Sequence, residues 1–159
     1  MTKAKPASGL RSENQPLDAI DSALLRALDA EARLPLSELS RRVGLSAPSV
    51  AERIRRMETS GVLTGFTVET DARALGYAIR ALVRIRPLPG KMHLVEQLIQ
   101  EMPAIVECDR ITGDDPFLAR LVARSVEEMD KALDALSGHA VTSTAVIKGQ
   151  SVKRRLPPL

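Results

Sequence analysis

A cluster of arginines lies in the first third of the chain and includes Arg41, Arg42, Arg53, Arg55 and Arg56. Between Arg33 and Arg56 the sequence holds six arginines and only two acids, Glu38 and Glu52, although the whole chain has a net charge of +3. Guanidinium groups form paired hydrogen bonds with phosphate oxygens and with the O6 and N7 atoms of guanine. The cluster therefore indicates an anionic partner.

Short polar residues lie among these arginines, namely Ser46, Ala47, Ser49 and Glu52. A serine can bond a phosphate or a base edge, and a glutamate can accept from N4 of cytosine. On this pattern we expect Arg53 to contact a base, and we expect phosphate contacts from Arg41, Arg42, Arg55 and Arg56. Arginine clusters also solvate ordinary exposed helices, so the elements that carry the cluster must decide between the two interpretations.

Three helices are expected around the cluster. Apolar residues at helical spacing predict a first helix from an Asp18 cap to about Ala30, a second over Leu36 to Val43, and a third from a Ser46 cap to Met57. Gly44 suits the left-handed residue that ends the second helix. Two short helices joined by a tight turn are typical of a helix-turn-helix, whose second helix enters the major groove of DNA. The stretch from Val62 to Val68 is either a short strand or a linker.

A different pattern begins at Tyr77. Strands are predicted over Ala78 to Arg86, Ile105 to Ile111, Phe117 to Ala123 and Thr142 to Val152, and helices are predicted around Leu94 to Met102 and from a Ser125–Glu128 capping box to Gly138. The expected apolar stripe of that last helix is Val126, Met129, Leu133 and Leu136. The order βαββαβ is that of a ferredoxin-like domain, with two helices on one face of a sheet.

The predicted fold class is therefore α+β, a three-helix winged-type helix-turn-helix followed by a ferredoxin-like βαββαβ domain. We expect five segments: a flexible tail over 1–16, a DNA-binding helix-turn-helix domain over 17–62, a linker strand or hinge over 63–75, a βαββαβ domain over 76–153, and a tail over 154–159.

Four stretches together resemble the Lrp/AsnC, or feast/famine, family of transcription regulators. They are Leu17-Asp18-Ala19-Ile20-Asp21, the run from Leu39 to Ser46, the run from Val50 to Val62, and Thr112-Gly113-Asp114. The resemblance covers roughly residues 17 to 153, in the family's order. It implies a bacterial-type regulator that binds double-stranded DNA and senses a small molecule.

The resemblance also implies that the domain over 76–153 binds an effector and oligomerises. Family members dimerise through the βαββαβ domain, assemble further into tetramers or octamers, and bind amino acids or related metabolites between dimers. Their ligand loop reads Gly-x-x-Asp followed by an aromatic residue; Gly113 and Phe117 fit this pattern, whereas Pro116 takes the Asp position. The implied effector-binding residues are Thr112, Gly113, Asp114, Asp115, Thr142 and Thr144.

Two other functions stay open on the sequence. Some proteins of this type decarboxylate a haem precursor, as in sirohaem decarboxylases, but His93 and His139 lie far apart here and next to no nucleophile motif. A DNA-free oligomeric scaffold is the other alternative. RNA is less favoured, because the chain has only two Phe, one Tyr and no Trp for base stacking.

We expect no cofactor, metal site or catalytic residue. The single cysteine, Cys108, forms no disulfide framework and is expected to be a small residue within a strand. No stretch approaches the roughly 18 uncharged apolar residues that a membrane span needs, and no leader with an apolar core precedes Leu17. The expected location is the cytoplasm.

Overall fold

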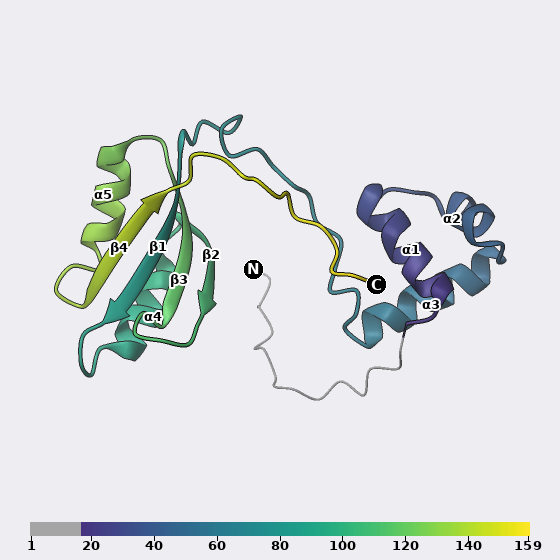
Figure 1. The fold of residues 1–159 in the computed structure, drawn as a ribbon, viewed down its shortest axis with the longest axis horizontal. Coiled ribbons are helices and arrows are strands. Elements are labelled where there is room, and N and C mark those ends of the chain that lie inside the picture. Colours follow the sequence, from purple (N-terminus) through teal and green to yellow (C-terminus); the bar gives the residue numbers. More distant parts are fainter. Residues whose placement is uncertain (1–16) are drawn as a thin grey trace. The chain divides into compact units, whose positions relative to one another are not determined.

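The computed structural model describes residues 17–159, and these form two compact units (Figure 1). The tail expected over 1–16 lies outside the described residues. Among the described residues, one unit comprises Leu17–Val68 together with Lys153–Leu159, and the other comprises Glu69–Val152. The last seven residues thus belong to the first unit, although they follow the second unit in sequence. The chain therefore passes between the units twice.

The first unit contains three helices, α1 (Ala19–Ala30), α2 (Leu36–Val43) and α3 (Ala47–Thr59), close to the predicted bounds. The Asp18 side chain caps α1 by accepting from the backbone amide of Asp21, and the Asp21 side chain accepts from the Asp18 amide in return. The Ser46 side chain caps α3, and Gly44 ends α2 at φ +68°. Only glycine adopts that left-handed conformation without a steric penalty.

One apolar cluster joins the three helices. Its buried residues are Leu24, Leu25, Leu28, Leu39, Val50 and Met57. Leu17, which precedes the Asp18 cap, packs against this cluster, as does Ile54 of the predicted α3 stripe. The cluster fixes α3 against α1, and so determines which face of α3 is exposed.

The stretch from Val62 to Val68 forms no strand, which excludes the first of its two alternatives. Its start is fixed to α3, where the Leu63 amide donates to the Met57 carbonyl at 2.9 Å. Farther along, Val68 is 82% exposed. A strand without a neighbour cannot pair its backbone groups, so the segment is a linker.

The second unit is a four-stranded antiparallel sheet with two helices. Its elements are β1 (Ile79–Pro87), α4 (Met92–Glu101), β2 (Ile105–Arg110), β3 (Phe117–Ala123), α5 (Val126–Asp134) and β4 (Ala140–Val146). The strand order is β2-β3-β1-β4, and each neighbouring pair is antiparallel. This arrangement confirms the predicted ferredoxin-like βαββαβ fold.

Three details of the prediction were wrong. The helix predicted to run to Gly138 ends at Asp134, and residues 135–139 form turns. The last strand ends at Val146 instead of Val152, because its partner β1 begins at Ile79 and offers no backbone beyond the bond from the Ile147 amide to the Arg80 carbonyl. Val126 was placed on the buried stripe of α5, but it is 54% exposed because it is the first residue of the helix. Met129 and Leu136 do carry the buried face.

Both helices cover the same face of the sheet. Ala81, Val83 and Ile85 of β1 are fully buried, and they belong to one cluster with Val95 and Ile99 of α4 and Met129 and Leu136 of α5. No element of residues 69–152 covers the opposite face, where Leu82 and Arg84 point.

None of the helices described over 17–159 is long and apolar enough to cross a membrane.

Candidate nucleic-acid interface and ligand site

Two arginines of α3 are bound to one buried carboxylate of α1. The side chain of Asp21 is 2% exposed; its Oδ1 accepts from Nη1 of Arg53 at 2.8 Å and its Oδ2 from Nη2 of Arg56 at 2.6 Å. Arg53 also bonds Oδ2 of Asp18 at 2.6 Å. The Asp21 amide, followed by the Arg53 guanidinium, lowers the pKa of Asp18 below its usual range. We call Asp18, Asp21, Arg53 and Arg56 the α1–α3 clamp.

The clamp bears directly on Arg53, which the sequence favoured for contact with a base. Its side chain is only 25% exposed, and its Nη1 donates to both Asp18 and Asp21. A buried carboxylate that loses its charged partner is costly, because water cannot solvate it. The structure therefore gives Arg53 a positioning role between α1 and α3. Arg56 shares this role, although 47% of its side chain is exposed.

The other three arginines have partners that remain accessible to water, half-buried Glu38 and exposed Glu52. Arg41 and Arg42 of α2 both bind the Glu38 carboxylate, at 2.6 and 2.9 Å, and their side chains are 78% and 46% exposed. These two guanidinium groups lower the pKa of Glu38. On α3, Arg55 binds Glu52 at 3.1 Å, and both side chains are at least 70% exposed. Such surface pairs contribute little free energy, so these arginines can exchange their partners for phosphate.

The start of α3 presents the predicted short residues. Ser46 and Ser49 are exposed, with their hydroxyl oxygens 2.8 Å apart, and Ala47 is half-buried beside them. The Ser49 amide donates to the Ser46 hydroxyl. The first amides of a helix and its dipole favour an anion near this end. The structure thus places Ser46, Ser49, Glu52 and Arg55 at exposed positions of α3.

Asp21 is the residue that motif reasoning missed as a functional partner. A signal was present, because Asp21 lies three and seven residues before Leu24 and Leu28 and so falls on the apolar face of α1. A carboxylate on a buried face needs a partner. Only the packing of α3 onto α1 identifies Arg53 as that partner, because the two residues are 32 positions apart in the sequence.

The predicted ligand loop connects β2 to β3. Within it Gly113 has φ +106°, a conformation that favours glycine, and Thr112, Gly113 and Asp114 are exposed. Asp115 is half-buried, and its Oδ1 accepts from Nε of Arg86 at 2.9 Å. Asp114 thus presents the exposed carboxylate of the loop, while Asp115 fixes the loop to β1.

The two threonines lie on the helix-covered side of β4. Thr142 and Thr144 pair with Ile85 and Val83 of β1, and they line an open hollow of about 500 Å³ beneath α5. The remaining lining residues are Asp130, Leu133, Asp134, Ser137 and Ala140. Residues 112–115 do not line this hollow. This hollow therefore does not combine the two halves of the predicted effector site.

Metal-ligating chemistry has no support within residues 17–159, where no three His, Cys, Asp or Glu side chains form a group suited to a metal ion. Cys108 lies in β2 and packs against the sheet core. Burial, followed by the charges of Asp109 and Glu96, raises the pKa of its thiol. A raised pKa makes a thiol a poorer nucleophile.

Comparison with known proteins assigns each unit to a family. Residues 17–58 match the model of the AsnC-type helix-turn-helix domain. Residues 80–157 match the model of the Lrp/AsnC ligand-binding domain. The two matches follow the order of the units and leave residues 59–79 between them.

Individual relatives agree. The chain is 34% identical over 121 residues to the HTH-type transcriptional regulator FL11 of Pyrococcus horikoshii, covering 76% of this chain and 80% of the relative. It is 33% identical to the HTH-type transcriptional regulator LrpC of Bacillus subtilis, covering 82% and 91%. The solved LrpC structure superposes with a TM-score of 0.82 at 31% identity, over 87% of this chain and 99% of LrpC.

A further solved structure carries a ligand. It is a feast or famine regulatory protein from M. tuberculosis complexed with L-methionine, with a TM-score of 0.81 and 28% identity over 89% of this chain and 99% of that chain. Both units, their order and their folds are common to these proteins. The chain is therefore a DNA-binding transcriptional regulator of the Lrp/AsnC family.

Proposed function

We propose that this protein contacts double-stranded DNA through Arg41, Arg42 and Arg55 and through the start of α3, and that an amino acid or related metabolite modulates the binding. One observation carries the DNA-contact assignment: Arg53 and Arg56 are bound to Asp21, whose side chain is 2% exposed, whereas the partners of the other three arginines, Glu38 and Glu52, are 25% and 70% exposed. We therefore expect the protein to bind DNA in the cytoplasm.

The exchange of partners is favourable for the exposed arginines only. A surface ion pair contributes about 0 to 1 kcal/mol, so Arg41, Arg42 and Arg55 lose little when phosphate replaces Glu38 or Glu52. Removing Arg53 from Asp21 would leave a carboxylate with 2% exposure short of a partner. We therefore assign base or phosphate contacts to Ser46, Ala47, Ser49, Glu52 and the three exposed arginines, and orientation of α3 to the clamp.

The effector site has the polar groups that a free amino acid requires. The Asp114 carboxylate can pair with an ammonium group, and the exposed backbone at Gly113 lets a ligand carboxylate approach closely. Thr142 and Thr144 offer hydroxyl groups at the separate hollow under α5. A relative of the same fold binds L-methionine. We infer that a second copy of the chain completes the site.

The uncovered sheet face supports that assembly. Leu82 lies opposite Arg120 on β3 and Ala145 on β4, and the apolar residues Leu118 and Val122 continue the face. Apolar side chains of this kind are stabilised when a second sheet covers them. We propose dimerisation through this face, with further assembly of dimers into a tetramer or octamer. A dimer spaces two recognition helices by about one turn of DNA, roughly 34 to 36 Å, or a multiple of that spacing.

Fluorescence anisotropy on labelled duplexes from around the protein's own gene tests DNA binding. Each phosphate contact contributes about 0.9 to the slope of log K against log salt, so Arg55→Ala is expected to reduce the slope by about that amount. Arg73→Ala, at an exposed position outside the three-helix unit, is the matched control. Equal slopes for the two variants would contradict the proposed face.

The same titration with L-methionine and with pooled amino acids tests effector sensing. Asp114→Asn is expected to weaken any shift in DNA affinity, because the amide cannot neutralise a ligand ammonium. Asp71→Asn, exposed outside the loop, is expected to behave as wild type. A response that is unchanged in Asp114→Asn would remove the loop from the effector site.

A further inference from the structure

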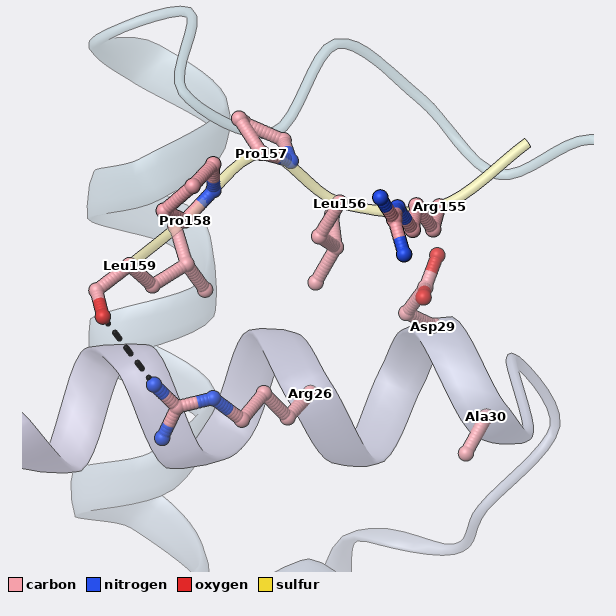
Figure 2. A pocket seen from close by; sticks show the side chains of 8 residues that line it. All are labelled: Arg26, Asp29, Ala30, Arg155, Leu156, Pro157, Pro158 and Leu159. Atoms are coloured by element: carbon pink, nitrogen blue, oxygen red, sulfur yellow. Dashed lines mark hydrogen bonds between the residues drawn. The ribbon is translucent and has the colours of Figure 1, made fainter. Parts of the chain in front are cut away.

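The last residues of the sequence are folded against α1 (Figure 2). Leu156 packs against the apolar cluster of the three-helix unit. At the end of the segment, Nη2 of Arg26 donates to the carbonyl oxygen of Leu159 at 3.1 Å. Figure 2 also shows the side chains of Arg155 and Asp29 pointing toward each other. These contacts run along α1 from Arg26 to Ala30 and border a hollow of about 410 Å³.

The sequence of this segment suits docking. Pro157 and Pro158 fix φ near −65° and favour a polyproline II conformation, which has three residues per turn. Leu156 and Leu159 are three residues apart, so that conformation places them on the same side. A segment already restricted by two prolines loses little conformational freedom when it binds, as in other proline-rich ligands. Leu156 therefore anchors a stiff peptide to α1.

The position of this peptide in the chain gives the contact a further consequence. The segment follows the ligand-binding unit, yet it belongs to the DNA-binding unit. Ten residue steps separate Val146, the end of β4, from Leu156, and an extended chain spans at most roughly 35 Å over ten residues. Docked Leu156 thus limits how far α1 can move from β4. This limit is independent of the Val62–Val68 linker.

We propose that Arg155–Leu159 is a strap, an internal docking peptide for the outer surface of α1 that restrains the DNA-binding unit. The outer surface of α1 is thus occupied by a segment of the same chain. The strap limits the positions open to the DNA-binding unit, so a dimer presents its two recognition helices with less loss of freedom on binding DNA. This consequence depends on the proposed function, whereas the docking itself does not.

Limited trypsin digestion tests the docking. In a background of Lys153→Gln and Arg154→Gln, Arg155 is the only basic residue between Val152 and Leu156. Cleavage after Arg155 is expected to be roughly tenfold slower than cleavage after exposed Lys148, because the docked segment must first detach. In Leu156→Ala the two rates are expected to converge. Val152→Ala shortens a side chain at an exposed site. This variant is expected to keep the slow cleavage after Arg155. Equal rates of cleavage after Arg155 and after Lys148 in the background protein, which keeps Leu156, would overturn the proposal.

A second measurement separates docking in one chain from exchange between copies. Chains carrying Leu156→Ala are mixed with isotope-labelled chains carrying Ala30→Asp, which alters the docking surface on α1. Docking within one chain predicts that both variants lose protection and that mixing restores none. Restored protection after mixing would mean that the segment docks on a second copy, and it would overturn the proposal.

DNA affinity tests the restraint. Leu156→Ala is expected to bind a duplex about fivefold more weakly than Val152→Ala, with an unchanged salt slope because no phosphate contact is lost. Equal affinities would overturn the restraining role of the strap. A wild-type protein that bound no duplex would instead contradict the proposed function, and the digestion would still decide whether the segment is docked.

Discussion

The guanidinium of Arg53 on α3 lies 2.8 Å from the carboxylate of Asp21 on α1, across 32 residues of sequence. Asp21 is buried and also binds Arg56, so one carboxylate binds two arginines of α3, the helix that carries part of the proposed DNA contacts. The burial of each acidic partner separates arginines that position α3 from arginines that are free to bind an anion.

Removing the buried charge tests the α1–α3 clamp. Asp21→Asn keeps the size of the side chain, but its single amide oxygen can replace only one of the two carboxylate oxygens that accept from Arg53 and Arg56. It is expected to lower the free energy of unfolding by about 2 kcal/mol. Glu58→Gln changes an exposed acidic residue of α3, and about 0.5 kcal/mol or less is expected. Urea unfolding followed by circular dichroism measures both. Similar values for the two variants would rule out a stabilising clamp.

The clamp also predicts a pH dependence. The pKa of Asp18 is lowered in the folded chain, by the Asp21 amide and then by Arg53. The unfolded chain therefore binds this proton more tightly, so the stabilisation is complete above the ordinary aspartate pKa of about 3.9 and is lost as the pH falls through the lower folded value. Asp18→Asn still caps the helix and should flatten the decline below about pH 4. An unchanged acid limb would exclude Asp18 as its source.

The turn between α2 and α3 depends on Gly44. At φ +68° an added Cβ meets no atom within 4 Å, so the penalty of Gly44→Ala comes from the backbone conformation alone. Thermal unfolding should show a loss of about 1 kcal/mol. Gly149→Ala serves as the control, because Gly149 is equally uncrowded and has no positive φ. If both substitutions were neutral, the turn would accept an ordinary residue.

The open sheet face predicts a specific oligomerisation variant. Leu82→Glu places a carboxylate opposite Arg120, which can pair with it in a monomer, while two such faces repel each other in a dimer. Sedimentation of this variant should show a monomer where the wild type shows a dimer or a larger assembly. Val126→Glu, at an exposed site on α5, should leave the assembly intact. A Leu82→Glu protein of wild-type mass would move the interface elsewhere.

Local signals in the sequence predicted most of the elements. The cap at Asp18, the stop at Gly44 and the cap at Ser46 each act within a few residues, and α2 was found at its predicted bounds. The alternation from Ile79 to Arg86 similarly predicted β1. Prediction failed for the end of β4, which pairs with β1 only as far as Val146, opposite Ala81 near the start of that strand.

Long-range packing decided the roles of the charged side chains. Arg53, Arg55 and Arg56 are the same residue type on the same helix. Only the packing of α1 against α3 pairs two of them with buried Asp21. Packing also placed Leu156 on α1, although its sequence neighbours belong to the other unit. The sequence by itself determined the elements, their order and the family, because caps, turns and hydrophobic periods are short-range. Tertiary structure decided which charges are free, because burial of a partner depends on residues distant in the chain.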